Sequence, residues 1–165
     1  MIRRNNSWVP KNFILDVDGV LTDGKIYYTK NGKMFKVFGA DDHDALNIVK
    51  KKMALSVVTA DHLGYKISQR RIKNDMKLDL NLVSSTHRVE WLSERFELEN
   101  CVYMGDGIFD PKVFEAVGYS IAPANASMGT QKKANFVTKT KGSEGAVAEA
   151  CIHLLDTFFE GFGLK

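Results

Sequence analysis

The sequence predicts an α/β fold, a Rossmann-like parallel sheet flanked by helices, in one domain that spans residues 1–165. Short apolar runs alternate with helical patterns along the chain, and this alternation is typical of parallel strands joined by crossover helices. A length of 165 residues supports one full hydrophobic core and is too short for two comfortable domains. The first apolar run, Phe13–Val17, leads into aspartates and a glycine turn, so a buried strand is expected to end there.

Each apolar run predicts a strand, and each periodic segment between runs predicts a helix. Strands are expected at Phe13–Val17, Ala54–Val58, Asp79–Val83, Cys101–Met104 and Tyr119–Ile121, with an edge strand at Phe136–Val137. Helices are expected at Asp42–Lys51, Leu63–Lys73, Thr86–Phe96, Pro111–Ala116 and Ser127–Lys133. In the last helix one apolar stripe, which predicts core packing, is formed by Val147, Cys151, Leu154, Leu155 and Phe158.

Residues 25–38 interrupt the alternation and predict a β-hairpin that projects from the end of the sheet carrying Asp16. The two strands are expected to be joined by Asn31-Gly32, a strong hairpin signal. The hairpin has apolar side chains at Ile26, Tyr28, Met34 and Val37. Two interpretations stay open: the hairpin is a flap or assembly surface, or its apolar side chains pack on their own domain.

Composition excludes several classes of function. The chain is 44% hydrophobic with a formal charge of +3, so no nucleic-acid partner is expected, and lysine runs such as Lys50–Lys52 are typical of solvated helix faces. Cys101 and Cys151 lie in apolar segments, which favours reduced core residues over a disulfide or a metal site. We see no long apolar stretch and no secretory signal at the start of the chain, so we expect a cytoplasmic protein with no membrane partner.

The stretch Asp16-Val17-Asp18-Gly19 predicts a phosphoryl-transfer site. Asp16 at a strand end can act as a nucleophile, while the turn at Gly19 lets Asp18 reach the same pocket and exchange protons. Two carboxylates facing a phosphate would repel it, so a divalent cation is expected. A calcium loop does not fit, because Val20 and Tyr27 stand where it needs oxygen ligands; a simple polar turn remains the alternative.

Three later positions can complete this site. Thr59 follows a strand, and its hydroxyl and the following amide, that of Ala60, can bind phosphate oxygens. Arg88 can stabilise developing negative charge, although a surface arginine would have the same sequence appearance. Asp106 follows another strand and a glycine, which predicts a metal ligand supported by Asp110.

On these residues the chain resembles the haloacid dehalogenase superfamily of phosphatases. Four motifs match in order: Asp16-Val-Asp18-Gly-Val, Thr59, a basic residue at Arg88, and Gly105-Asp106 with Asp110. The stretch Leu21–Gly24, the hairpin and residues 142–147 are most similar to the branch of this superfamily that acts on 3-deoxy-octulosonate 8-phosphate and nonulosonate phosphates.

The resemblance implies a capless Mg²⁺-dependent phosphomonoesterase acting on a phosphorylated sugar or sugar acid in surface-polysaccharide (lipopolysaccharide) precursor synthesis. It assigns the metal to Asp16, the carbonyl of Asp18, and Asp106, and the phosphoryl oxygens to Thr59 and Arg88. The implied reaction proceeds through an aspartyl phosphate on Asp16. The resemblance further implies a homotetramer in which a neighbouring subunit covers the pocket, with the tail Phe158–Gly163 as a covering element; a frayed terminus is the alternative.

Several positions depart from the pattern of the sugar-acid branch. Arg88 replaces a lysine, Ala60-Asp61 replaces Gly-Arg, and Gly107 replaces a second aspartate. After the hairpin, where an Asp-Gly pair is expected, the chain has Asp42-His43, and Glu144 replaces an arginine. Specificity residues are therefore expected among Asp42, His43, Asp61, Arg70 and Arg71, with Lys66 as a further cation. Two alternatives stay open: a phosphatase of another small phosphate, and a catalytically degenerate oligomerisation or regulatory module linked to a sugar-nucleotide enzyme.

Overall fold

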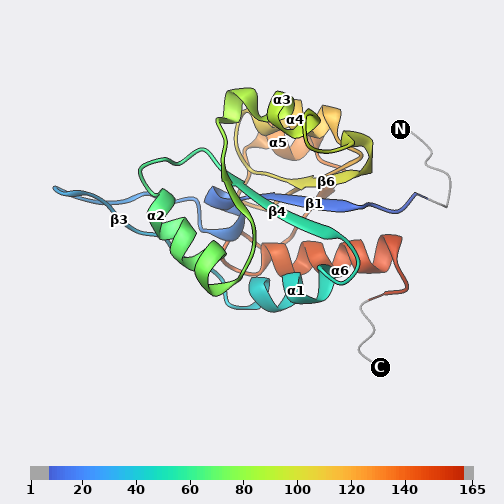
Figure 1. Ribbon diagram of the computed structural model, residues 1–165, viewed down its shortest axis with the longest axis horizontal. Helices are drawn as coiled ribbons and strands as arrows, with labels where there is room; N and C mark the ends of the chain where they lie inside the picture. Colours follow the sequence, from blue (N-terminus) through green and yellow to red (C-terminus); the bar gives the residue numbers. More distant parts are fainter. Residues whose placement is uncertain (1–7, 162–165) are drawn as a thin grey trace.

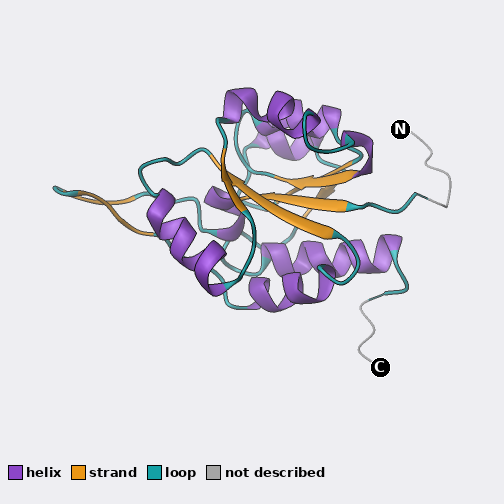
Figure 2. Ribbon diagram, viewed as in Figure 1, coloured by secondary structure: helices purple, strands orange, loops and turns teal. Residues whose placement is uncertain are grey.

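A computed structural model describes residues 8–161 and confirms the expected α/β architecture (Figure 1). Within these residues six parallel strands form one sheet, in the order β5-β4-β1-β6-β7-β8. The strands are β1 (Asn12–Asp16), β4 (Ala54–Thr59), β5 (Leu80–Leu82), β6 (Cys101–Met104), β7 (Tyr119–Ala122) and β8 (Phe136–Val137). Helices cover both faces of the sheet (Figure 2), which explains why the strands read as nearly continuous apolar runs.

Side chains of β1 alternate between two halves of the core. Phe13 and Leu15 pack on the face covered by α1 (Asp41–Val49) and α6 (Ala146–Phe158), whereas Ile14 packs on the opposite face. That opposite face is covered by α3 (Arg88–Ser93), α4 (Asp110–Ala116) and α5 (Met128–Lys133). The predicted stripe of α6 is buried as far as Leu155, and both cysteines are free and buried, as expected.

Helix boundaries differ from the predicted ones for local reasons. The helix expected at Leu63–Lys73 begins later, as α2 (Tyr65–Ser68), and continues as a wider helical segment, η2 (Gln69–Asp75). The helix expected from Thr86 begins with a short turn, η3 (Ser85–His87), and the hydroxyl of Thr86 hydrogen-bonds with that of Ser84, the residue before this turn. Ser127 is the N-cap of α5, where its hydroxyl accepts a hydrogen bond from the amide of Thr130, so it lies outside the helix.

The predicted hairpin is present as β2 (Tyr27–Thr29) and β3 (Gly32–Phe35), but its turn lies one residue earlier than predicted. Lys30 and Asn31 form the turn, and Gly32 already pairs with Thr29. Gly32 has a φ of 109°, a conformation that favours glycine, so the glycine is used at the first position of the strand.

The hairpin projects away from the domain (Figure 1) and leaves most of its apolar side chains in solvent. Ile26, Tyr28 and Met34 are 66%, 58% and 61% exposed, which contradicts the interpretation that they pack on their own domain. A bridge between Thr22 and Phe38 closes the base of the hairpin beside the turn that follows β1. The hairpin therefore extends from the end of the sheet at which β1 ends.

The C-terminal aromatic residues that the structure describes belong to this chain's own core. Phe158 makes edge-to-face contacts with Trp8 and Tyr119, at ring-centroid distances of 5.0 and 5.1 Å, and Phe159 packs against the same core. These two residues therefore pack partly on their own chain, and residues 162–163 of the predicted tail lie outside the described range. Among residues 8–161, none of the helices is both long and apolar enough to cross a bilayer.

Candidate active site

Three predicted site residues meet at one edge of the sheet because their strands are parallel neighbours. Asp16 is the last residue of β1, and Thr59 is the last residue of β4, which pairs with β1. Asp106 follows β6, which pairs with β1 on its other side. The carboxyl ends of parallel strands lie at the same edge, where open α/β sheets bind ligands.

The turn η1 (Val17–Leu21) after β1 brings Gly19 against the carboxylate of Asp106. Gly19 has a φ of 84°, and a Cβ there would overlap that carboxylate, so only glycine fits both the backbone conformation and the space. Asn125 stabilises the turn: its Nδ2 donates to the Gly19 carbonyl at 2.8 Å, and its Oδ1 accepts from the Gly142 amide at 2.7 Å. The segment that begins at Gly142 thus helps to hold the turn that follows Asp16.

Asp16 is held by hydrogen bonds to both of its carboxylate oxygens. Oδ1 accepts from the Val17 amide at 2.9 Å, and Oδ2 accepts from Nη1 of Arg88, also at 2.9 Å. Burial raises the pKa of Asp16 to about 6, although the charge of Arg88 opposes this change. Arg88 comes from α3 on the far side of the sheet and is buried, so the predicted basic residue does reach the predicted nucleophile.

Tyr103 links Arg88 to Asp110. Arg88 donates to the Tyr103 hydroxyl at 2.7 Å, and that hydroxyl donates to Oδ1 of Asp110 at 2.9 Å. The Gly107 amide donates to Oδ2 of Asp110 at 2.8 Å. Both oxygens of Asp110 are therefore engaged, which agrees with a supporting role for this residue. Burial, followed by the charge of Asp110, raises the pKa of Tyr103 above its ordinary value, so its hydroxyl stays protonated.

The carboxylates at this edge form a set suited to a hard divalent cation. Asp16, Asp106 and Asp110 each offer an oxygen, and these oxygens lie within 4.8 Å of one another. Burial, then the charges of Asp16 and Asp110, raises the pKa of Asp106 to about 8. A cation would relieve this repulsion, and an all-oxygen donor set is the one that Mg²⁺ prefers. Since Asp110 is buried whereas Asp16 and Asp106 are partly exposed, Asp16 and Asp106 are the better candidates for direct ligands.

We expect the metal-free protein to be more stable near pH 6 than near pH 8. The pKa of Asp106 is about 8 when folded against 3.8 ordinarily, so the folded protein holds a proton that the unfolded chain releases. Stability from this group is therefore present at low pH and lost as pH rises through 8. Thermal unfolding at several pH values in a chelator, and again in excess Mg²⁺, measures the effect; the metal should largely remove it.

The control for this pH dependence is Asp106→Asn, which cannot titrate. We expect its melting temperature to change less between about pH 6 and pH 8 than that of the unaltered protein. Equal pH dependence in both proteins would contradict the assignment of the raised pKa to Asp106.

Asp18 lies on the side of Asp16 away from Arg88, between the end of β4 and the hairpin. The Thr59 hydroxyl donates to Oδ2 of Asp18 at 3.1 Å and accepts from the Asp61 amide at the same distance. Nζ of Lys36, the residue after β3, lies 2.7 Å from Oδ1 of Asp18 and 2.9 Å from Oδ2 of Asp61. Burial opposes ionisation of Asp61, but hydrogen bonds from Lys33 and Lys36 outweigh it and lower the pKa of Asp61 to about 2.

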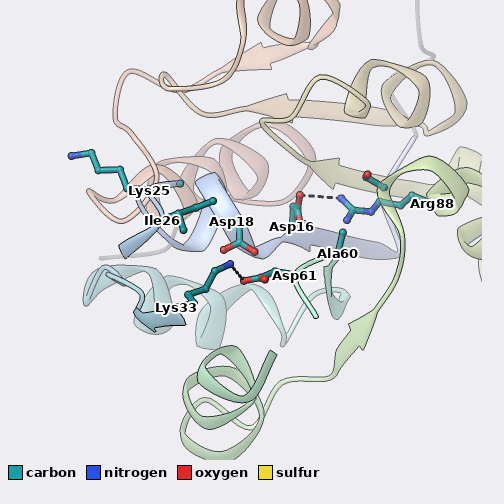
Figure 3. Close-up of a pocket in the computed structure, with 10 residues that line it drawn as sticks. Asp16, Asp18, Lys25, Ile26, Lys33, Ala60, Asp61 and Arg88 are labelled. Atoms are coloured by element: carbon teal, nitrogen blue, oxygen red, sulfur yellow. Dashed lines mark hydrogen bonds and ion pairs between the residues drawn. The ribbon is translucent and has the colours of Figure 1, made fainter. Parts of the chain in front are cut away.

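A cavity of about 350 Å³ opens at this edge (Figure 3). The residues that line it come from the β1 turn, the hairpin, the loop after β4 and the start of α3; they are Asp16, Asp18, Gly24, Lys25, Ile26, Lys33, Ala60, Asp61, Ser85 and Arg88. Both predicted catalytic aspartates face this cavity, and the cations around it come from Arg88 and from the hairpin (Figure 3).

Four of the five predicted specificity residues do not line this cavity. Asp42 is buried and accepts a hydrogen bond from the Ala148 amide at 2.9 Å, so it stabilises the first turn of α6. Arg70 pairs with Asp75 at 3.4 Å on the surface, and neither His43 nor Arg71 is among the lining residues. The additional cation Lys66 is exposed and also lies outside the lining set. Within one chain, Asp61 is the predicted specificity residue that reaches the site.

Sequence reasoning did not identify the lysines of the hairpin or Tyr103. Lys33 and Lys36 resemble ordinary solvated lysines in sequence, and their spacing in a hairpin carries no signal that distinguishes them. Tyr103 lies within an apolar strand and reads as a core residue. Their contacts are visible only in the structure: Lys33 and Lys36 pair with Asp61, and Tyr103 accepts a hydrogen bond from Arg88.

Several known proteins are similar to this chain. A family model described as haloacid dehalogenase-like hydrolase matches residues 91–151. The 3-deoxy-D-manno-octulosonate 8-phosphate phosphatase of Salmonella typhi is 32% identical over 152 residues, which covers 86% of this chain and 77% of that protein. The phosphatase of the same name from Escherichia coli K12 is 33% identical over 147 residues, with the same coverage.

Solved structures give the same likeness. A 3-deoxy-D-manno-octulosonate 8-phosphate phosphatase from Moraxella catarrhalis, in complex with magnesium, phosphate and KDO, superposes with a TM-score of 0.77 at 27% identity, covering 92% of this chain and 89% of that one. The phosphatase of the same name from Yersinia pestis has a TM-score of 0.76 at 29% identity, covering 96% and 89%.

Proposed function

Because this chain belongs to the haloacid dehalogenase-like hydrolases and is a phosphatase of that family, we propose that it hydrolyses a phosphorylated sugar or sugar acid with the help of Mg²⁺. The observation that carries the proposal is the shared cavity of Asp16 and Asp18. Asp16 is fixed by Arg88 at 2.9 Å, and Asp18 is held by Thr59 and Lys36. A nucleophile and a proton-exchanging group thus face the same space from one turn.

In the proposed reaction, a carboxylate oxygen of Asp16 attacks phosphorus and Asp18 gives a proton to the departing sugar oxygen. Asp18 then takes a proton from the water that hydrolyses the aspartyl phosphate, which returns Asp16 to its starting state. The Ala60 amide, which lines the cavity, binds a phosphoryl oxygen, and Arg88 stabilises the negative charge of the phosphoryl group. Thr59, expected to bind phosphate, is buried and donates its hydroxyl proton to Asp18, so its part is to orient that carboxyl group. Magnesium held by Asp16, Asp106 and the Asp18 carbonyl would supply positive charge that lets a phosphate approach the aspartates.

Charges at the cavity support a sugar acid as the substrate. Lys25 and Lys33 line it. Lys33 pairs with Asp61 and offsets its charge, which leaves Lys25 as the cation that can receive a carboxylate in place of the arginine that Asp61 replaces. Asp61 itself can accept hydrogen bonds from sugar hydroxyls. The relative from Moraxella catarrhalis binds KDO, itself a sugar acid, and this likeness favours the same class of substrate.

Assembly and location remain parts of the proposal. The exposed apolar side chains Ile26, Tyr28 and Met34 support a homotetramer in which hairpins of neighbouring subunits meet. Sedimentation equilibrium measures this state, and a monomer at all concentrations would contradict it. A cytoplasmic role in lipopolysaccharide precursor synthesis is the setting that this substrate class implies.

The test of the function is phosphate release from a panel of sugar phosphates, sugar-acid phosphates and other small phosphates, with and without Mg²⁺. We expect Mg²⁺-dependent turnover, highest with 3-deoxy-octulosonate 8-phosphate or a nonulosonate 9-phosphate. Turnover that is highest with an unrelated phosphate would support the second candidate, a phosphatase of another metabolite. A folded, Mg²⁺-binding protein that releases no phosphate from any compound would contradict the proposed function and favour a degenerate module.

A further inference from the structure

We propose that Lys36 is a positioning residue of the reaction, which holds the carboxyl group of Asp18 where it can protonate the leaving oxygen. This inference rests on the proposed function and deepens it, because it assigns a role to a hairpin residue that lies outside the four motifs. Lys36 does not line the cavity; it acts through Asp18, which does.

Lys36 is a buried, ion-paired lysine and not a solvated surface lysine. Its side chain is only 3% exposed, although lysine is among the residues least often buried. An ammonium group has three donors, and three acceptors surround this one: Asp18 at 2.7 Å, Asp61 at 2.9 Å and the Ser68 hydroxyl at 2.9 Å. A buried cation is tolerated when it is paired and hydrogen-bonded in this way.

Lys36 completes the fixation of Asp18. The carboxyl group of Asp18 is 38% exposed at the cavity, and it has one contact on each oxygen: Thr59 on Oδ2 and Lys36 on Oδ1. Thr59 comes from β4 and Lys36 from the hairpin, so the two contacts come from separate elements. Figure 3 shows Asp18 and Asp61 close together beside the hairpin lysine Lys33. Without Lys36, Thr59 alone would restrain the carboxyl group, which could then rotate.

This fixation matters in the first step of the reaction. As the bond between Asp16 and phosphorus forms, the bond between phosphorus and the leaving oxygen breaks, and its electron pair goes to that oxygen. The oxygen takes the proton of the Asp18 carboxyl group, which becomes a carboxylate beside the Lys36 ammonium. Alignment of the proton and stabilisation of the new carboxylate both depend on Lys36. Basic leaving groups need this proton, whereas p-nitrophenolate leaves without it.

The test therefore compares leaving groups. We would measure kcat/KM for aryl phosphates of graded leaving-group basicity, from phenyl to p-nitrophenyl phosphate, since these substrates share shape and charge. For Lys36→Met we expect about a 100-fold loss with phenyl phosphate, within the range that proton transfer contributes, and a loss below about threefold with p-nitrophenyl phosphate. The ratio of the kcat/KM values for two substrates does not depend on how much of the enzyme is folded.

Lys33→Met is the matched control, because Lys33 lies on the same hairpin and contacts Asp61 but not Asp18. It should leave the dependence on leaving-group basicity unchanged, whereas Asp18→Asn should reproduce the dependence seen in Lys36→Met. Lys36→Arg keeps the charge and should recover part of the kcat/KM that Lys36→Met loses with phenyl phosphate.

The outcomes separate this inference from the proposed function. If Lys36→Met lowers kcat/KM by one factor for all aryl phosphates, Lys36 has only a structural role and the inference is overturned. If the unaltered protein hydrolyses neither the aryl phosphates nor any compound of the substrate panel, the proposed function fails, and the inference fails with it.

Discussion

Asp16→Asn should abolish Mg²⁺-dependent phosphate release, with a loss in kcat of about 10⁴-fold or more, because an amide oxygen is a poor nucleophile toward phosphorus. The substitution preserves the size of the side chain and its place at the end of β1. It also removes one of the three clustered carboxylates, so Mg²⁺ affinity, measured by calorimetry, should change together with kcat.

The matched control is Asp75→Asn, the same chemical change at a surface aspartate that pairs with Arg70 outside the cavity. We expect it to retain normal turnover and Mg²⁺ affinity. A protein with Asn at position 16 that still turned over at an appreciable rate, with no contamination by unaltered enzyme, would show that another group attacks phosphorus.

Arg88→Met should destabilise the protein by about 3–5 kcal/mol and also abolish activity, because it removes the cation from a buried charged network. Arg88 is 2% exposed and contacts Asp16, Tyr103 and Asp110 with one guanidinium nitrogen. Loss of this cation would leave the carboxylates of Asp16 and Asp110 facing each other without compensation. Urea unfolding in a chelator measures the change, and lower pH should reduce it, because protonated carboxyl groups no longer repel.

Arg95→Met is the control for Arg88→Met. Arg95 follows α3, lies over the ring of Trp91 at 4.2 Å and pairs with Glu94 on the surface. The substitution should cost about 1 kcal/mol or less and leave activity intact. Arg88→Lys should lie between the two extremes, since lysine keeps the charge but not the planar fork. Equal stability of Arg88→Met and Arg95→Met would contradict the energetic role of the network.

Local patterns predicted the elements of this fold, and the structure confirms their order and type. The apolar run before Asp16 is a buried central strand, and alternation of strands and helices led to a parallel sheet. The hairpin turn was misplaced by one residue because Asn31-Gly32 fits two arrangements. Both residues can form the turn, or Asn31 can end the turn while Gly32 begins the next strand, as the structure shows.

The candidate site divides in the same way. Asp16, Thr59 and Asp106 were predictable because each stands at or just after the end of a strand, and parallel strands end at one edge. The roles of Lys36 and Tyr103 were not, because a lysine in a hairpin and a tyrosine in an apolar strand have common structural explanations. Asp42 was expected near the substrate, yet the fold uses it at the start of α6.

By itself, therefore, the sequence determined the α/β class, the site residues at the carboxyl ends of the strands, and the family. These depend on local periodicity and on short motifs. Only the tertiary structure decided which cation meets which carboxylate. Arg88 and Asp16 are 72 residues apart in the chain, and Lys36 reaches Asp18 and Asp61 from the hairpin. Ion pairs and hydrogen bonds depend on distances of a few ångströms in space, and in this protein packing of the helices and the hairpin against the sheet sets those distances.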